Sequence, residues 1–251
     1  MKRLLEDFDR NGFVILENVL DESFCERAVY EMERAIEKEV EYQGTKNYPY
    51  YGYVLCNAVY GGVFLDIFEN EDLWAIVNSI MGENSILYSY TSSSMPPRSG
   101  NSASKIHIDT NIVQEKIFRL GIFIPINEHT SKNGGLTFLP GSHKLKARPT
   151  EEEYLTNCVR FDSKGGDVLL FNAQLWHSGG MNRTDQWRHA ITMNVGQPWM
   201  KQRVDMPKMM MKQKINLNTL SEEARVKLGF YSQVPTSYDE YFDTAITRKF
   251  L

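Results

Sequence analysis

Cysteine is scarce in this sequence, and its three cysteines, Cys25, Cys56 and Cys158, lie far apart. An odd number of scattered cysteines without a C-x-x-C pair is not typical of a disulfide framework or of a zinc knuckle. We therefore expect buried, inert thiols and a cytoplasmic protein, because thiols stay reduced in that compartment.

Long apolar runs and basic blocks are also missing. The longest apolar runs, such as LGIFIPI and DVLLF, are too short to span a bilayer. Acidic residues interrupt the N-terminal stretch MKRLLEDFDRNGFVIL, so we expect neither a secretory signal nor a membrane partner. The net charge is −4 at pH 7 and no cluster of lysine and arginine stands out. The charge pattern therefore argues against a nucleic-acid partner.

The first third of the chain has the spacing of amphipathic helices. Apolar side chains recur three and four positions apart in residues 22–42, and Asp21 occupies the place of an N-cap. Residues 71–81 carry a second helical stretch. We interpret residues 1–84 as an N-terminal helical layer, which begins with a short helix at 4–11 and a strand in GFVILENV.

From about residue 85 the chain turns to short segments rich in β-branched and aromatic residues, separated by Gly, Pro, Asn and Asp. These segments predict a mainly β fold, a double-stranded β-helix (jelly-roll, cupin-like) core over about residues 85–200. We expect a single domain over 1–251, with a C-terminal extension at about 201–251. The segments are SILYSYTSSS, KIHIDTNIV, IFRLGIFIPIN, GGLTFLPGS, CVRFDS, GDVLLFN, LWHSGG and RHAITMNVGQP.

Two features mark the C-terminal extension. Ser221 stands where it would cap a helix in EEARVKL, and Gly229 follows the end of that helix. The methionine-rich run MPKMMMKQK has two interpretations, a soft surface that contacts substrate or the packing of a core or subunit interface, and we favour packing.

The segment KIHIDTNI places a histidine and an aspartate two positions apart. Alternate residues of a strand share a face, so His107 and Asp109 are predicted to point the same way. Alone, such a pair is more often structural than catalytic. His177, at the start of a later predicted strand, completes a set of two imidazoles and one carboxylate, which is the facial triad of non-haem Fe(II) sites.

Arg188 follows His177 across the turn-like sequence MNRTDQ. If a hairpin is centred between residues 182 and 183, the two residues lie opposite each other and project to one face. A guanidinium there could hold a carboxylate through a bidentate pair, and the distal carboxylate of 2-oxoglutarate fits that need. The competing interpretation is an arginine paired with an acid of the core.

At this point the sequence resembles the phytanoyl-CoA hydroxylase (phytanoyl-CoA dioxygenase) family of Fe(II)/2-oxoglutarate-dependent dioxygenases. The resemblance covers about residues 5–200. It is carried by GFVILENVLDESFCERA, SMPP, HID, GIFIPINEHTSKNGGLTFLPGSHK, GGDVLLFNAQLWHSGG and the arginine of WRHAI.

The resemblance implies iron on His107, Asp109 and His177, with 2-oxoglutarate anchored by Arg188 and O2 as co-substrate. The sequence departs from the usual pattern at Ile112, three positions after the aspartate, and at Ala190, where relatives often carry a hydroxyl. We expect Ser178 or Thr192 to supply that hydroxyl, and we add Phe123 to the residues expected to bind the cosubstrate.

The expected activity is hydroxylation of an aliphatic C–H bond with release of succinate and CO2. Halogenases of this superfamily need a small residue in place of the carboxylate, so Asp109 favours hydroxylation. Desaturation, cyclisation or epimerisation stay open, as does a non-catalytic jelly-roll binding protein. A zinc hydrolase is a weaker alternative, because the sequence points to no general base.

The substrate is expected to be a small metabolite or natural-product intermediate. Tyr51 and Tyr53, in NYPYYGYVL, could line the mouth of the site, and Arg98 and Lys105 could meet an anionic group. Packing tyrosines and solvated loop charges are the alternatives. Homo-oligomerisation is left open.

The remaining histidines are given no role in the site. His143 is expected to order a turn, His189 to pack, and His129 to lie on an exposed loop.

Overall fold

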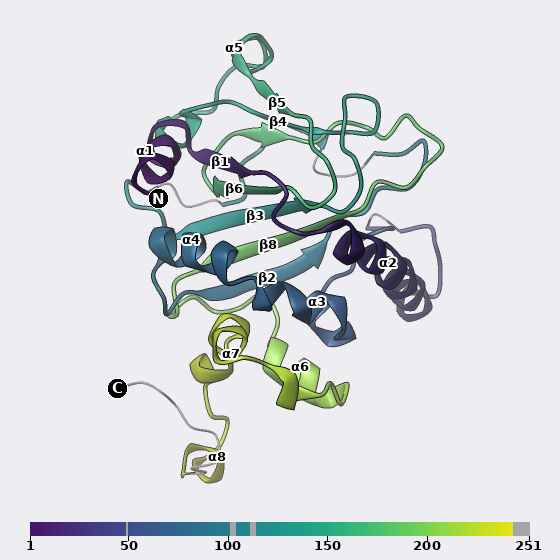
Figure 1. Ribbon diagram of the computed structural model, residues 1–251, viewed down its shortest axis with the longest axis vertical. Helices are drawn as coiled ribbons and strands as arrows, with labels where there is room; N and C mark the ends of the chain where they lie inside the picture. The colour runs from purple at the N-terminus through teal and green to yellow at the C-terminus, as the bar shows by residue number, and fades with distance from the viewer. Residues whose placement is uncertain (49, 101–103, 111–113, 243–251) are drawn as a thin grey trace.

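A computed structural model describes residues 1–251 except 49, 101–103, 111–113 and 243–251 (Figure 1). Its strands form two antiparallel sheets, one in the order β1-β6-β3-β8-β2 and a smaller one in the order β5-β4-β7. The strands are β1 (Phe13–Leu16), β2 (Ile86–Ser92), β3 (Arg119–Pro125), β4 (Leu136–Phe138), β5 (Val159–Phe161), β6 (Val168–Asn172), β7 (His177–Ser178) and β8 (Ala190–Gly196).

Helices precede, interrupt and follow these strands. They are α1 (Lys2–Asn11), α2 (Glu22–Gln43), α3 (Val63–Asp66), α4 (Glu71–Met81), α5 (Glu151–Asn157), α6 (Met206–Lys212), α7 (Glu222–Leu228) and α8 (Tyr238–Phe242). Helical segments occupy more of the described chain than strands do, so the expectation of a mainly β chain is met only in part. A bilayer span would need a longer and more apolar helix than any in the described part of the chain.

The two long helices form where their sequence signals predict. The Asp21 carboxylate accepts a hydrogen bond from the Phe24 amide (2.7 Å) and caps α2. The apolar stripe of α2, including Ala28 and Met32, is buried. The Asn70 side chain caps α4 in the same way. The apolar spacing of both helices and the Asp21 cap are as expected, and the structure adds the Asn70 cap, which was not predicted from the sequence.

The larger sheet is covered on both faces. Leu120, Ile122 and Ile124 of β3 pack in one cluster with residues of α2 and α4. Phe123 of the same strand packs in a second cluster with Phe138 of β4. Because side chains alternate along a strand, one face meets the helices and the other faces the smaller sheet. Figure 1 shows β4 and β5 on one side of the larger sheet and α2 and α3 on the other.

Two predicted strands are much shorter in the structure. Within residues 105–110 only His107 pairs with another segment, through an isolated β-bridge to His177. The rest of that segment includes Ile112, which lies outside the described residues. In LWHSGG only His177–Ser178 is a strand. Loops interrupted by bridges therefore replace regular strands around these histidines.

The C-terminal extension packs on the core through buried side chains. Met206 and Met210 of α6 lie in the main cluster, as the packing interpretation predicted. Lys227 of α7 is fully buried. Its ammonium donates to Asn78 Oδ1 (2.6 Å) and Ser85 Oγ (3.0 Å). These bonds fasten α7 to α4 and to the start of β2, since leaving a buried charge unpaired is costly.

Two of the three cysteines have the burial expected of inert thiols. Cys25 and Cys56 are buried and Cys158 is half-buried, and all three are free. Burial raises the pKa of the Cys25 and Cys56 thiols to about 11. Neither thiol is therefore reactive at neutral pH.

Gly121 makes room for an aromatic ring beside the site. A Cβ at Gly121 would lie 2.3 Å from Cζ of Phe171, on the neighbouring strand β6. We predict that Gly121→Ala lowers the free energy of unfolding by about 1–3 kcal/mol, because it overpacks the core. Denaturant unfolding measures this loss. The double variant Gly121→Ala/Phe171→Leu should recover part of the lost stability, and additive effects of the two substitutions would contradict the proposed clash.

Candidate metal centre and cosubstrate pocket

Three side chains converge between the two sheets. His107 Nε2 and His177 Nε2 each lie 3.7 Å from Asp109 Oδ1. One ligand atom from each residue lies within 4.8 Å of the others. The structure thus brings together the two imidazoles and the carboxylate that the sequence singled out.

The backbone around the two histidines sets this geometry. The His107 amide donates to the His177 carbonyl, and the His177 amide donates to the His107 carbonyl, both at 2.9 Å. The Asp109 amide donates to the carbonyl of Ala173, also at 2.9 Å. These long-range hydrogen bonds hold the two segments in register without a regular strand.

The outer nitrogen of each imidazole is tied to the backbone. His107 Nδ1 donates to the Lys105 carbonyl (2.7 Å), and His177 Nδ1 donates to the Leu175 carbonyl (2.9 Å). A carbonyl only accepts, so Nδ1 carries the proton and Nε2 presents its lone pair to Asp109. Such outer hydrogen bonds orient metal-binding histidines in proteins.

Burial keeps His177 neutral. It lowers the pKa of this imidazole, the nearby Asp109 carboxylate raises it, and His107 lowers it again. A neutral imidazole is the form that binds a metal. Two nitrogen donors and one carboxylate oxygen fit a non-haem Fe(II) centre that leaves coordination positions open.

These ligand atoms face a cavity of about 550 Å³. Arg188 also lines this cavity and is only 2% exposed. Its guanidinium donates to the carbonyls of Gly134 (2.6 Å) and Ser93 (2.9 Å), while Nε is buried without a hydrogen-bond partner. Burial lowers the pKa of Arg188 to about 10. None of the ion pairs found among the described residues involves Arg188, so the competing interpretation, pairing with a core acid, has no support there.

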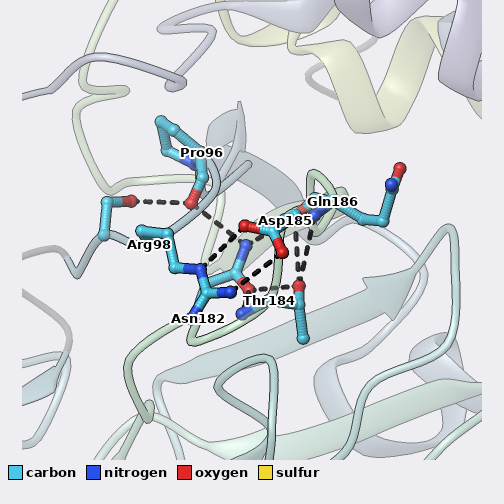
Figure 2. A network of polar contacts seen from close by, with 7 residues as sticks. Pro96, Arg98, Asn182, Thr184, Asp185 and Gln186 are labelled. Atoms are coloured by element: carbon cyan, nitrogen blue, oxygen red, sulfur yellow. Dashed lines mark hydrogen bonds and ion pairs between the residues drawn. The ribbon is translucent and has the colours of Figure 1, made fainter.

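The predicted hairpin between His177 and Arg188 is wrong. His177 pairs with Phe138 in the smaller sheet, whereas Arg188 forms a bridge with Met95 and leads into β8 of the larger sheet. Asn182 organises the connection, because its amide donates to the carbonyls of Pro96 and Gln186 (Figure 2). His177 and Arg188 therefore reach the same cavity from two different sheets.

Of the three residues expected to bind the cosubstrate together with Arg188, two line the cavity and one does not. Thr192 and Phe123, paired across β8 and β3, both line the cavity. The Thr192 hydroxyl is buried without a partner, so it is free to meet a ligand. Ser178 does not line the cavity, because its hydroxyl is turned to Thr137 Oγ1 (3.1 Å).

Of the four residues expected to contact substrate, two line this cavity and two do not. Tyr53 and Lys105 line the cavity. Tyr51 lines a different one and packs edge-on against Trp187, with ring centroids 5.6 Å apart. Arg98 points to an exposed ion pair with Asp185, with Nε and Nη2 each 2.8 Å from a carboxylate oxygen (Figure 2). Tyr51 and Arg98 therefore do not reach this cavity.

Sequence reasoning missed several residues of the cavity wall. Ser89, Thr91 and Asn194 line it, and so do Arg148 and Arg203. Asn194 lies two positions from Thr192 along β8, so strand alternation could have identified it. Arg148 and Arg203 lie on loops, where no periodic signal exists.

The predicted position of one remaining histidine, His129, is wrong. His129 is fully buried rather than on an exposed loop, and burial lowers its pKa well below the usual value. His189 packs as expected, stacked on Trp187, and burial lowers its pKa to about 4. His143 lies in a short 3-10 turn, as expected, and donates from Nε2 to the Asp9 carbonyl.

Comparisons with known proteins identify relatives of this chain. The sequence profile of the phytanoyl-CoA dioxygenase (PhyH) family matches residues 8–190. An uncharacterised protein of Mycobacterium tuberculosis is 25% identical over 242 residues, 92% of this chain and 87% of that protein. The peroxisomal phytanoyl-CoA dioxygenase of Rattus norvegicus is 25% identical over 224 residues, 75% of this chain and 66% of that protein.

A solved structure shares the fold. HygX from Streptomyces hygroscopicus, solved with nickel and 2-oxoglutarate bound, superposes with a TM-score of 0.62 at 16% identity. The match covers 80% of this chain and 89% of HygX.

If the three side chains bind a metal, substitution of any one of them should weaken metal binding. We expect His107→Ala and Asp109→Ala to weaken Fe(II) binding by more than about a hundredfold, because loss of even an outer-shell partner costs 10- to 100-fold. Anaerobic calorimetric titration with Fe(II) measures this. His143→Ala removes a histidine outside the set and should leave the affinity unchanged. Normal Fe(II) affinity in either ligand variant would refute the assignment.

Proposed function

The chain belongs to the phytanoyl-CoA dioxygenase (PhyH) family, and from that premise we propose that it hydroxylates an aliphatic C–H bond of a small metabolite or natural-product intermediate. It is a non-haem Fe(II)- and 2-oxoglutarate-dependent dioxygenase that uses O2. The observation that carries the more specific proposal is the convergence of His107, Asp109 and His177 on a cavity that also contains the buried guanidinium of Arg188.

In this proposal His107, Asp109 and His177 hold the iron. When bound, Fe(II) and 2-oxoglutarate supply the power to oxidise the substrate with O2, with succinate and CO2 as by-products. The protein supplies orientation. The carbonyls of Lys105 and Leu175 fix both imidazole rings, so little reorganisation is needed when the metal binds.

Arg188 holds the distal carboxylate of 2-oxoglutarate. The carbonyls of Gly134 and Ser93 fix the plane of its guanidinium. A charge-assisted hydrogen bond from a buried, oriented arginine is stronger than one in water, because the surroundings have a low dielectric constant. The unpartnered Thr192 hydroxyl would supply a second hydrogen bond to the cosubstrate, and the Phe123 ring would form part of the apolar wall beside it.

Aromatic rings cover the His177 side of the centre. The rings of Phe171 and Phe138 lie 5.1 and 5.9 Å from the His177 ring, centroid to centroid. These rings keep water from the His177 imidazole. His107 and Asp109, whose side chains are 33% and 23% exposed, stand on the side of the centre that is open to the cosubstrate and the substrate.

Two features support hydroxylation of a small molecule. Asp109 would be the third protein ligand of the iron, at the position that halogenases leave to a halide, so it favours hydroxylation over halogenation. The cavity volume of about 550 Å³ lies within the range typical of small-molecule sites. A non-catalytic role is less well supported, because the three donors and the buried arginine are all in place.

The proposed reaction is tested by succinate release from a metabolite panel under air. We expect succinate to form only when Fe(II), 2-oxoglutarate and an accepted compound are all present. With labelled O2, the product should carry one oxygen atom from the gas, as mass spectrometry can detect. If the product gains no oxygen and is instead dehydrogenated, cyclised or inverted at one carbon, the reaction is desaturation, cyclisation or epimerisation and not hydroxylation. If no compound of the panel leads to succinate, the result counts against catalysis.

The role of Arg188 gives a separate prediction. Arg188→Ala should weaken 2-oxoglutarate binding by roughly ten- to a hundredfold, because a hydrogen bond to a charged group contributes about 1.5–3 kcal/mol. Fe(II) affinity should stay near that of the wild type. Arg98→Ala, at an exposed arginine outside the cavity, is the matched control. An unchanged 2-oxoglutarate titration in Arg188→Ala would refute the assignment.

A further inference from the structure

Positive side chains outnumber negative ones around the cavity. Lys105, Arg148, Arg188 and Arg203 line it, and Asp109 is the only acidic residue in its described lining. This imbalance stands out because the whole chain has a net charge of −4.

Binding of the cofactors does not remove the imbalance. In the proposed function, the charges of ferrous iron and a doubly negative 2-oxoglutarate cancel, and so do those of Asp109 and Arg188. Lys105, Arg148 and Arg203 are then left over. None of the ion pairs found in the described part of the chain involves any of the three.

Arg203 lies far from the proposed oxoglutarate anchor. Its amide donates to the Tyr88 carbonyl (2.9 Å), which places it beside the end of β2 where Ser89 pairs with Asn194. Six residues of extended chain lead from Arg188 to Asn194. At about 3.3 Å per residue, the backbones of these two residues lie roughly 20 Å apart. The cavity wall therefore carries positive charge at both ends of β8.

The Arg203 end of the cavity wall is polar below the surface as well. The Asn194 Oδ1 atom is buried without a partner. Arg119 does not itself line the cavity, but its guanidinium stacks on Tyr88 at 5.0 Å, the residue whose carbonyl holds the Arg203 amide. Buried polar atoms normally find partners, so the unpartnered Asn194 Oδ1 in the cavity lining favours a polar ligand over an empty pocket.

An aromatic ring holds the Arg148 guanidinium in place. Its guanidinium lies over the ring of Trp176 at 5.7 Å, and Trp176 directly precedes the metal-site residue His177. Stacking on an aromatic face restricts an exposed arginine and leaves its edge free for a carboxylate or phosphate.

We propose that the substrate carries an oxyanion, a carboxylate or a phosphate group, which Arg148 and Arg203 bind while Lys105 adds a third positive charge at the cavity. This inference rests on the proposed function and adds the substrate class. The uncharged part of the substrate then lies between these cations and the metal residues. Because Arg148, Arg203 and Lys105 are exposed, attraction between them and the substrate weakens as salt screens the charges.

Three probes that share one ring test this substrate class. The enzyme is loaded anaerobically with Fe(II) and saturating 2-oxoglutarate, then titrated by calorimetry with benzoate, phenyl phosphate and benzamide. At least one of the two anions should bind roughly tenfold or more tightly than uncharged benzamide. The tighter anion indicates whether the natural group is a carboxylate or a phosphate. If benzamide binds as well as both anions, the inference is overturned.

Matched variants locate the effect. The double variant Arg148→Gln/Arg203→Gln should lose the preference for the anion, whereas Arg160→Gln, which removes an exposed arginine outside the cavity, should keep it. Anion binding that is unchanged in the double variant would also overturn the inference.

The loading step separates the two levels of the argument. Failure of Fe(II) and 2-oxoglutarate to bind the wild type refutes the proposed function, and the inference falls with it. Normal loading without a preference for anions refutes only the substrate class.

Discussion

The reciprocal backbone hydrogen bonds between His107 and His177 are the constraint on which the site depends. They join two segments that are far apart in sequence, at a place where the structure has neither a long strand nor a helix to align them. With the Asp109 amide bonded to Ala173, they fix three side chains, two from a loop and one from the short strand β7, within reach of one ion. A rigid pair of sheets positions these segments, and loops held by a rigid scaffold commonly carry function.

Alternation along the central strands divides the molecule into a packing side and a chemical side. Even-numbered residues of β3 meet the helices, and odd-numbered residues face the smaller sheet. On β8 the same alternation sends Thr192 and Asn194 into the cavity while Met193 is buried against the helical side. A shift of one residue in the register would exchange the two sets. The register that builds the core therefore also builds the site.

The sequence predicted the parts of this molecule that local periodicity and capping determine. The helix after Asp21 needed an apolar stripe and a cap, and the helix at 71–81 was found from its apolar spacing alone. The two histidines and Asp109 were found from residue type and the resemblance to a family, although His107 lies in an isolated bridge rather than in the regular strand that was predicted. The hairpin to Arg188 failed because Asn182 directs the chain from one sheet to the other through side-chain bonds, which have no periodicity. Arg148 and Arg203 were missed for the same reason, since loop side chains gather only through tertiary structure.

Electrostatics links the bound groups to one another. Without ligands, the cavity has an excess of positive charge, and a ferrous ion increases that excess. Binding of 2-oxoglutarate, with two negative charges, relieves it, so metal and cosubstrate favour each other's binding. Linkage makes this coupling equal in both directions. In the proposed function, Arg188 and the three exposed cations have different roles. Bonding to a carboxylate would offset the cost of burying the Arg188 charge. The exposed cations would attract an anion at little cost to folding, because water solvates them when no anion is bound.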